Sequence, residues 1–331
     1  MHNNLSKSRS KKLTVWAALA AFSIASLTGC APAAEVPTEL IVVTHDSAVF
    51  DEALLAAFTA ETGFTVKQLK AGDTGAMTNK LVLTKDQPIG DVFFGIDNTF
   101  AGVATDNSIV DGELTAVDFG DVCFNYDKNW FADNEQAVPT SIKDLIEPEF
   151  EGLTVLSNPT TSSPGLAFLA ATVSTFGESG WQAYWKALKD NQVKIAAGWE
   201  DAYFTDFSGS SGKGAYPIVL SYSSSPAFEV REDGISQTAS ILDGCFRQTE
   251  YAGVLKGAKN KPGAEAFVKF LLSPDFQKSL PDTMYVYPIV EGTELPEVWA
   301  QWATVSPNPV GAELDINANR KAWLQKWAAI F

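Results

Sequence analysis

The sequence predicts an α/β protein built from two lobes, and three observations carry this prediction. About 300 residues remain beyond a predicted N-terminal export signal, which is more than one hydrophobic core usually holds. Short β-branched runs alternate with helical patterns, and this alternation occurs twice along the chain. Polar loops recur at the ends of the predicted strands, where open α/β sheets bind ligands. Together they predict mostly parallel sheets that share one cleft.

Residues 1–29 are predicted to be a cleavable lipoprotein signal. Four basic residues precede an apolar run from Leu13 to Leu27, which is short for a membrane span. The run ends in Leu27-Thr28-Gly29-Cys30, which resembles a lipobox, so Cys30 is the predicted lipidation site and residues 30–38 a tether. An uncleaved anchor helix is the alternative. Both interpretations place the rest of the chain outside the cytoplasmic membrane, attached to it through the N-terminus.

The net charge and the rare residue types of the chain exclude some classes of binding partner. Removing residues 1–29 changes the formal net charge from −16 to about −20, which argues against nucleic acid, because phosphates need Lys and Arg. The same charge is compatible with a small cationic ligand. The chain has only His2 and His45, so a histidine-based zinc site is not expected, and we predict no metal and no cofactor. After Cys30 only Cys123 and Cys245 remain, an even pair in an oxidising compartment.

The first α/β series begins at Glu39. Residues 39–44 form a continuous apolar run, which is typical of a buried parallel strand. Apolar residues then recur at helical spacing until Gly63 ends the pattern. The expected elements are a strand at 39–44, a helix at 50–62, a strand at 64–69, a helix at 75–84 and a strand at 91–94, which is followed by Gly95-Ile96-Asp97-Asn98.

The second series repeats this alternation, and two helices follow it late in the chain. Its expected elements are a strand at 153–157, helices at 165–176 and 181–190, a strand at 193–197, a helix that begins near Glu200, a strand at 218–222, and helices at 264–272 and 317–329.

Five polar or aromatic loops follow strands of these two series. Asp, Asn, Ser and Gly are also ordinary turn and helix-capping residues, so one such loop carries little weight. Five loops at equivalent strand ends favour a single ligand cleft. The loops are His45-Asp46-Ser47, Asp97-Asn98, Thr160 to Ser163, Gly198-Trp199 and Tyr222 to Ser225.

The sequence lacks two motifs that are typical of catalytic proteins. The segment Gly209-Ser-Ser-Gly-Lys-Gly214 lacks the spacing of a phosphate-binding P-loop and has no Ser or Thr after its lysine. A serine hydrolase would need a Gly-x-Ser-x-Gly elbow, which is absent, and His45 would be its only candidate base. We therefore expect no catalytic residues and no enzyme, and a secreted hydrolase that uses His45 remains the alternative from another class.

Several of these segments, in the same order, resemble the substrate-binding proteins of thiamine ABC transporters. The two most specific are Gly198-Trp-Glu-Asp-Ala-Tyr203 and Leu220-Ser-Tyr-Ser-Ser-Ser-Pro-Ala227. The others are Thr44-His-Asp-Ser47, Gly95-Ile-Asp-Asn98, Asp118-Phe-Gly120, Tyr126-Asp-Lys128, Asn158-Pro-Thr-Thr-Ser-Ser-Pro-Gly165 and Tyr287-Pro288. The resemblance covers most of the chain from about Glu39 to Trp327 and implies the type II periplasmic-binding-protein fold, in which two α/β lobes joined by two crossover strands close on a ligand.

The resemblance implies thiamine or a thiamine phosphate as the ligand. The residue types fit, because a flat cation favours aromatic faces and carboxylates. Trp199, Tyr203, Tyr222 and Tyr285 are the candidate rings, although core packing is the alternative for each. The expected polar contacts are His45, Asp46, Ser47, Asp97, Asn98 and Ser162. In similar proteins His45 is often tyrosine, Tyr285 typically tryptophan and Phe228 tyrosine, so the preferred form of the vitamin stays open.

The resemblance also implies the domain boundaries and a hinge. Lobe 1 is expected at 39–120, lobe 2 at 121–243, and a return to lobe 1 with C-terminal helices at 244–331. The outward crossing strand would lie at 119–126 and the return near 242–250, so that Cys123 and Cys245 would form a disulfide across the hinge. Two buried free thiols are the alternative.

We thus predict a monomeric extracytoplasmic binding protein, anchored by lipid, that delivers its ligand to an ABC permease and its ATPase. Two rivals share the fold. A ferric-ion carrier would need hard oxygen donors, typically paired tyrosines, and here serines follow Tyr222. A polyamine-binding protein would share the shorter sequence segments.

Overall fold

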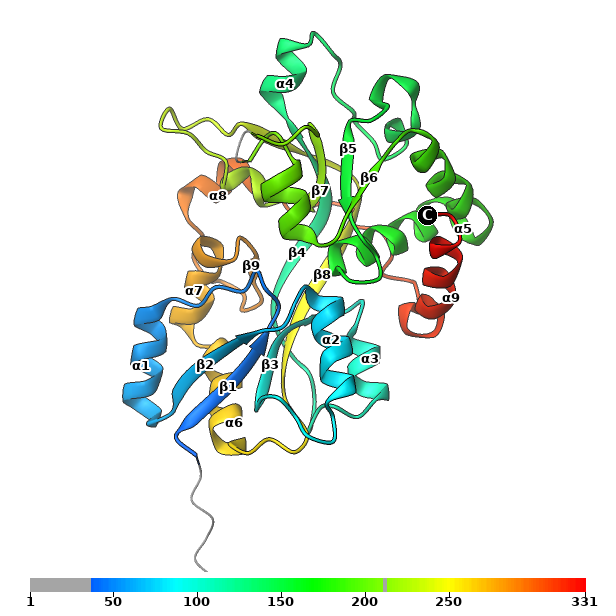
Figure 1. The fold of residues 1–331 in the computed structure, drawn as a ribbon. Helices are drawn as coiled ribbons and strands as arrows, with labels where there is room; N and C mark the ends of the chain where they lie inside the picture. The colour runs from blue at the N-terminus through cyan, green and yellow to red at the C-terminus, as the bar shows by residue number, and fades with distance from the viewer. Residues whose placement is uncertain (1–36, 211–212) are drawn as a thin grey trace, which may run out of the picture. The chain divides into compact units, whose positions relative to one another are not determined.

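The computed structural model describes residues 37–210 and 213–331, so the predicted signal and Cys30 lie outside the described residues. Among the described residues nine strands form one mixed sheet, in the order β2-β1-β3-β8-β4-β7-β5-β6, with β9 paired to β4. No described helix has the length and apolar character that a membrane crossing requires. The sheet curls through two α/β lobes, which confirms the predicted fold class (Figure 1).

The first lobe contains strands β1, β2 and β3, which pair in parallel. Helix α1 begins where the Asp51 carboxylate accepts the backbone N–H groups of Ala53 and Leu54, and it ends at Gly63, whose φ of 78° suits glycine. The elements of this lobe are β1 (Glu39–Thr44), α1 (Glu52–Thr62), β2 (Thr65–Lys70), α2 (Thr74–Leu83), β3 (Val92–Asp97) and α3 (Ala101–Asp106).

Strand β3 is longer than the sequence predicted. It continues through Gly95 to Asp97, because the antiparallel strand β8 pairs with Ile96 and Asp97 after a bulge at Gly95, where φ is 99°. Asp97 therefore belongs to the end of a central strand, and Asn98 to the turn that follows it directly.

The second lobe contains β5, β6 and β7, which are also parallel to one another. The two helices predicted at 165–176 and 181–190 are confirmed as parts of α5, which is broken at Gly177 (φ 71°, ψ 169°). The elements of this lobe are α4 (Lys128–Asp133), η1 (Asp144–Ile146), η2 (Pro148–Phe150), β5 (Thr154–Ser157), α5 (Ser163–Asp190), β6 (Lys194–Ala196), the π-helical turn η3 (Asp201–Asp206), β7 (Ile218–Tyr222) and η4 (Ser225–Ala227).

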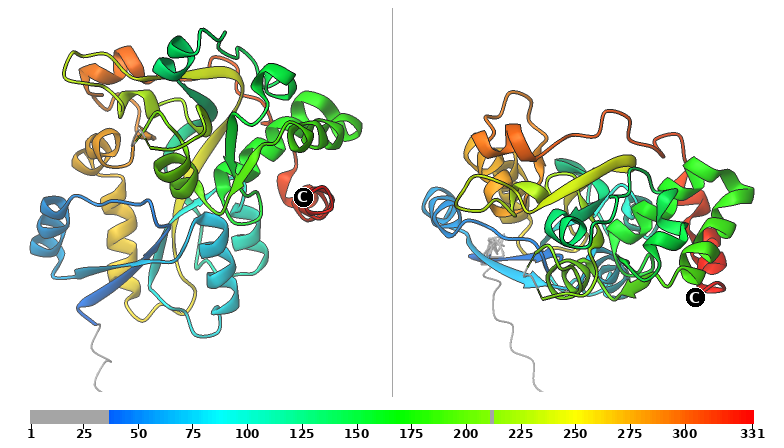
Figure 2. Two further views of the ribbon diagram at one scale, coloured as in Figure 1. Left: turned by 45° about the horizontal axis from the view of Figure 1, so that its top comes forward. Right: turned by 90° about the horizontal axis from the view of Figure 1, so that it is seen from above.

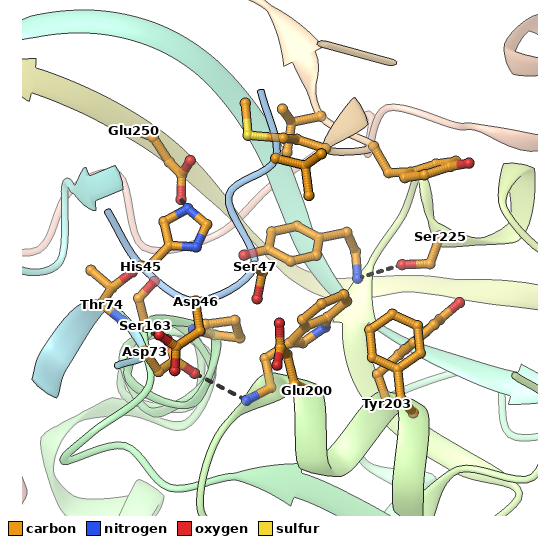
Figure 3. A pocket seen from close by; sticks show the side chains of 18 of the residues that line it. His45, Asp46, Ser47, Asp73, Thr74, Ser163, Glu200, Tyr203, Ser225 and Glu250 are labelled. Atoms are coloured by element: carbon orange, nitrogen blue, oxygen red, sulfur yellow. Dashed lines mark hydrogen bonds and ion pairs between the residues drawn. The ribbon is translucent and has the colours of Figure 1, made fainter. Parts of the chain in front are cut away.

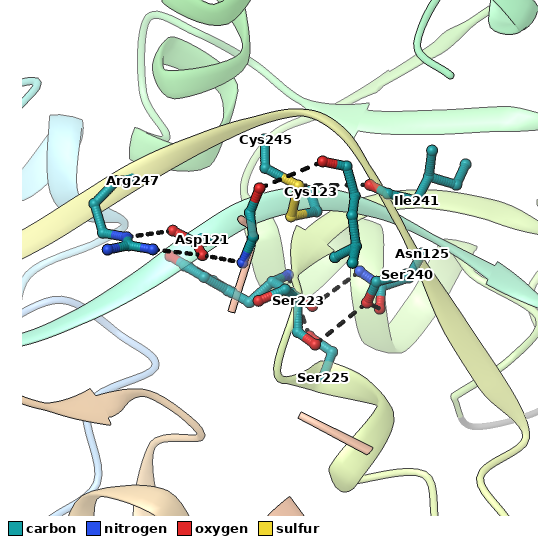
Figure 4. The surroundings of a disulfide bond; sticks show 12 residues. Asp121, Cys123, Asn125, Ser223, Ser225, Ser240, Ile241, Cys245 and Arg247 are labelled. Carbon is teal, nitrogen blue, oxygen red and sulfur yellow. Dashed lines mark hydrogen bonds and ion pairs between the residues drawn. A yellow bond between two sulfur atoms is a disulfide. The ribbon is translucent and has the colours of Figure 1, made fainter. Parts of the chain in front are cut away.

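Two long antiparallel strands join the lobes: β4 (Thr115–Asp127) and β8 (Thr238–Val254). Their register shifts between Val122 and Phe124, where residues 242–245 of β8 bulge out. Cys123 and Cys245 form a disulfide across this bulge, as predicted (Figure 4). Close by, the Arg247 guanidinium donates two hydrogen bonds to the buried Asp121 carboxylate, at 2.5 and 3.0 Å.

The end of the chain contacts both lobes. Helices α6 (Lys261–Leu271) and α7 (Pro274–Thr283) pack on the first lobe, and β9 (Tyr287–Pro288) pairs with β4. Helix α8 (Glu297–Trp302) then packs on η4 of the second lobe, and α9 (Ile316–Ala328) packs on both α5 and α3 (Figure 2). Residues 36–331 form one compact unit, and the lobe boundaries stay a prediction.

The largest hydrophobic core runs from the first lobe into the second. It includes Phe93 of β3, Phe124 of β4, and Trp181 and Trp185 of α5, and each side chain is almost completely buried. Burying each such side chain stabilises the fold by about 1.5–3 kcal/mol. The crossover strands are thus packed into a shared core, which fixes the loops that follow β1, β5 and β7 next to one another.

Candidate ligand-binding cavity

A cavity of about 280 Å³ lies where the loops after strands of both lobes meet. The first lobe contributes the loop after β1, the start of α2 and the end of α7, and the second contributes the starts of α5 and η3 and the end of β7. Seven residues proposed from the sequence line it: His45, Asp46, Ser47, Trp199, Tyr203, Tyr222 and Tyr285. Asp46, Asp73 and Glu250 lie on one side and Tyr203 on the other, with Glu200 between them (Figure 3).

The aromatic side is built around Trp199. Its ring stacks on Tyr203, with centroids 5.2 Å apart and planes 18° apart, and Tyr222 meets it at 65°. The indole N–H donates to Ser221 Oγ at 2.9 Å, and the Tyr203 hydroxyl donates to Glu229 at 2.9 Å. Tyr203 is only 1 % exposed, so it serves mainly as the backing of Trp199, whose half-buried ring also has Phe204 edge-on at 5.4 Å and lines the cavity.

Tyr285 approaches from the end of α7, with its ring perpendicular to that of Phe228 at a centroid distance of 4.6 Å. Its backbone has a φ of 55°, which is unusual for a residue with a large side chain. The Ser224 hydroxyl holds this turn in place by donating to the Tyr285 carbonyl at 2.5 Å. The first lobe therefore presents its ring on a turn that is fastened to the second lobe.

The opposite side carries Asp46, Asp73 and Glu250, and the lining also includes Lys70 and, next to Trp199 in the chain, Glu200. Asp73 has two roles. One oxygen caps α2 by accepting the Thr74 N–H at 2.7 Å, and the other accepts the backbone N–H of Trp199 at 3.0 Å. This carboxylate therefore joins the start of α2 in the first lobe to the aromatic side of the second.

His45 and Glu250 meet at one end of the cavity, with Nε2 and Oε1 3.6 Å apart. The imidazole lies so close to Gly95 that a Cβ there would be 2.1 Å from His45 Cδ2. Burial disfavours the imidazolium, but the carboxylates of Glu250, Asp73 and Asp46 together outweigh burial and raise the pKa of His45.

Three residues proposed from the sequence do not line the cavity: Asp97, Asn98 and Ser162. The Asp97 carboxylate accepts the N–H and hydroxyl of Thr99 and the N–H of Phe100, and its side chain is fully buried. Asn98 instead bonds to the backbone of β8, and the Ser162 hydroxyl donates to Ser157.

These three residues secure the framework under the site. Ser163, the next residue after Ser162, takes its expected place in the lining together with Pro164 at the start of α5. The serine that lines the cavity at the start of α5 is thus Ser163, one position after the predicted Ser162.

The sequence interpretation missed several lining residues, among them Asp73, Thr74, Glu200 and Glu250. Asp73 and Thr74 follow β2 at its carboxyl end, so the rule that selected the other loops could have found them. Glu250 lies inside β8, and no local pattern distinguishes it from an ordinary strand residue. Within the described ranges no cluster of three His, Cys, Asp or Glu side chains is placed to hold a metal ion.

Comparison with known proteins places these features in context. Residues 94–304 match the family described as bacterial extracellular solute-binding protein. The thiamine-binding periplasmic protein of Salmonella typhimurium is 29 % identical over 90 % of this chain and 95 % of its own length. The protein of the same name from Brucella melitensis is 28 % identical over 94 % of this chain and 97 % of its own length.

Solved structures agree at the level of the fold. A periplasmic thiamin binding protein superposes with a TM-score of 0.77 and 25 % identity, covering 88 % of this chain and 96 % of that chain. Iron-bound HitA from Pseudomonas aeruginosa superposes with a TM-score of 0.70 at 18 % identity, covering 88 % and 99 % of the two chains, and its likeness concerns the fold alone.

Proposed function

Because this chain belongs to the family of bacterial extracellular solute-binding proteins, we propose that its cavity binds thiamine or a thiamine phosphate for delivery to an ABC importer. The observation that carries this proposal is that the Trp199 and Tyr222 rings line the same cavity as the carboxylates of Asp46 and Asp73. The thiamine-binding names of relatives that align over most of their length support the same ligand. The family is one of binding proteins rather than enzymes.

The chemistry of thiamine matches the two sides of the cavity. The molecule joins a flat aminopyrimidine to a positively charged thiazolium ring with a hydroxyethyl tail. A desolvated cation against an aromatic face contributes about 1–2 kcal/mol, and Trp199 and Tyr222 offer such faces. Asp46 and Asp73 would accept the exocyclic amine or offset the positive charge, and Ser163 would meet the tail. A volume of about 280 Å³ suits a ligand of this size.

Delivery would use the two-lobed architecture. We propose that the lobes, divided near residues 120 and 243, close on the ligand by a shift between populations and that the closed form docks on a permease. Lipid attachment at Cys30 and a monomeric state belong to the same proposal. An exported, tethered binder would capture the vitamin outside the membrane and release it at the importer.

Isothermal titration calorimetry tests the ligand and the ring together. We expect thiamine to bind and Trp199→Ala to weaken binding at least tenfold, because the stacked face is lost. Trp199→Phe would keep a ring without the indole N–H and should retain part of the affinity. Trp302→Ala is the matched control, since Trp302 is outside the cavity lining and should leave affinity unchanged.

The same titration separates the rival functions. Ferric citrate and a polyamine should give no binding heat under conditions in which thiamine saturates the protein. An ester-hydrolysis assay covers the hydrolase alternative, whose candidate base, His45, faces the Glu250 carboxylate. Absence of thiamine binding by a folded protein, or tight ferric binding, would overturn the proposed function.

A further inference from the structure

His45 is the one histidine in the compact unit formed by residues 36–331. It lines the cavity, and its ring lies against Gly95 of β3 and 6.1 Å from the Phe94 ring, centroid to centroid. Its Nε2 faces Glu250 Oε1 at 3.6 Å, which is ion-pair range but too long for a hydrogen bond. A titratable ring is thus placed between a buried carboxylate and the space where a ligand would bind (Figure 3).

The charged groups around His45 come from several elements. Glu250 faces it from β8, Asp73 from the start of α2, and Asp46 from its own loop. The Lys70 ammonium at the end of β2 donates to the Asp46 carbonyl at 2.6 Å. The surroundings of the imidazole are therefore dominated by negative charge, with one lysine at the margin.

A second layer of acids lies behind Glu250. Asp118 of β4 is completely buried, and burial followed by the nearby Glu250 charge raises its pKa well above the usual range. Gln248 Nε2 donates to Glu250 Oε1 at 3.3 Å, and the Tyr222 hydroxyl donates to Gln248 Oε1 at 3.2 Å. Of these two acids, Glu250 is the one whose carboxylate faces His45 Nε2.

We propose that a cationic ligand and the His45 proton compete for this carboxylate cluster, so that ligand binding releases a proton from the protein. In the free protein the imidazolium balances Glu250. When the positive ring of the ligand enters the cavity, two cations would share one end of it, and His45 gives up its proton to solvent. This inference rests on the proposed function in one respect only, that the ligand is a cation.

The sign of the effect follows from linkage. Glu250, Asp73 and Asp46 raise the pKa of His45 above its ordinary value of 6.5 in the free protein, and a bound cation opposes them. Between the bound and free midpoints the free protein holds a proton that the complex lacks. Affinity therefore rises with pH in this window, by up to tenfold per pH unit, and levels off above the free midpoint.

Nuclear magnetic resonance measures the first half of the proposal without any ligand. A protein of residues 31–331, labelled with ¹³C-histidine, contains only His45. Its single imidazole signal therefore needs no separate assignment. We expect its titration midpoint to lie above 6.5 in the free protein and to fall in Glu250→Gln, because the facing charge is removed. A midpoint below 6.5, or one that Glu250→Gln leaves unmoved in a folded protein, would overturn the proposal.

Calorimetry measures the second half. Thiamine titrated at about pH 7 into buffers of different ionisation enthalpy reports the protons released per binding event, and a substantial fraction of one proton is expected. His45→Gln, which keeps a polar side chain but cannot titrate, should release none and should lose the pH dependence of its affinity. Equal proton release by the wild type and His45→Gln would contradict the inference.

The two proposals fail in different ways. If thiamine binds with no proton release, the competition is refuted while the ligand assignment stands. If thiamine does not bind at any pH, the ligand assignment is refuted. A small organic cation without a pyrimidine, such as choline, then serves as the probe. If saturating choline does not lower the titration midpoint of His45, the competition is refuted as well.

Discussion

Asp97 illustrates how a single buried carboxylate can make stability depend on pH. Its side chain is fully buried, and burial, opposed by hydrogen bonds from Thr99, raises its pKa to about 6 from 3.8. Between these two values the folded state keeps the proton and the unfolded state does not, so unfolding releases a proton. The free energy of unfolding therefore falls as pH rises from about 4 to about 6, and it levels off above that range.

Asp97→Asn should remove this dependence. Asn keeps an oxygen for the Thr99 and Phe100 donors but cannot ionise. Relative to the variant, the wild type should lose about 2–3 kcal/mol of stability between about pH 4 and pH 7. Urea denaturation of both proteins at several pH values measures the difference. Parallel pH profiles would show that Asp97 does not titrate in this range.

At the scale of residues, the sequence identified side-chain chemistry better than side-chain direction. His45, Trp199 and Tyr222 were predicted at strand ends and line the cavity. Asp97 was predicted by the same rule and is instead buried under it, because β8 extends β3 by pairing with it. Glu250 could not be predicted, since its place depends on which strand lies next to β8.

The bulge of β3 shows how an element shapes the cavity. Gly95 allows the strand to turn and leaves room for the His45 ring, which a side chain at this position would displace. Gly112 provides a comparison, because it has a similar φ of 104° and a Cβ added to it would have no neighbouring atom within 4 Å.

Gly95→Ala should therefore cost more than Gly112→Ala. Both substitutions introduce backbone strain of about 1–3 kcal/mol, but only Gly95→Ala displaces His45. Thermal unfolding should show a larger loss for Gly95→Ala, and calorimetry should show weaker thiamine binding for that variant alone. Equal effects of the two substitutions on stability and affinity would show that the room left by Gly95 is not what positions His45.

A second prediction at the scale of elements concerns the disulfide between the crossover strands. The disulfide closes a loop between residues 122 positions apart in sequence, which in the chain-entropy model stabilises the fold by about 4–5 kcal/mol. Urea midpoints with and without reductant should reveal this loss in residues 31–331, and Cys123→Ala with Cys245→Ala should no longer respond to reductant. Two reactive thiols in unreduced, denatured protein would refute the bond.

Hydrogen bonds near the cavity connect the two lobes in the whole molecule. The backbone N–H groups of Gly75 and Ala76 at the start of α2 donate to the Thr161 carbonyl, at 3.0 and 3.2 Å, and Trp199 N–H donates to Asp73. Each donor and acceptor belongs to a different lobe. A ligand that favours closure should lengthen the lifetime of these bonds.

Amide hydrogen exchange tests this expectation. Saturating thiamine should slow exchange at Gly75, Ala76 and Trp199 by at least tenfold, because their bonds break only when the lobes part. The Gly263 N–H, which begins α6 by donating to Asn260 within the first lobe, is the control and should change little. Uniform protection of all amides would indicate general stabilisation without closure.

At this scale the sequence predicted the architecture, and it missed how the C-terminus is used. Alternating strands and helices indicated both lobes, and the family resemblance implied the two crossover strands and the disulfide between them. The paths of α8 and α9 could not be predicted, because their partners are specified by long-range packing such as that of Trp327 on Trp185.

That packing limits how such proteins can be recombined. A chimaera that received only residues 128–237 of this protein would lack α9. It would therefore lack the Trp327 ring, which packs on Trp185. Trp302, whose indole N–H bonds to the Gly234 carbonyl, would be left behind as well. Functional chimaeras should therefore exchange the interior segment together with residues 297–331, which contain α8 and α9.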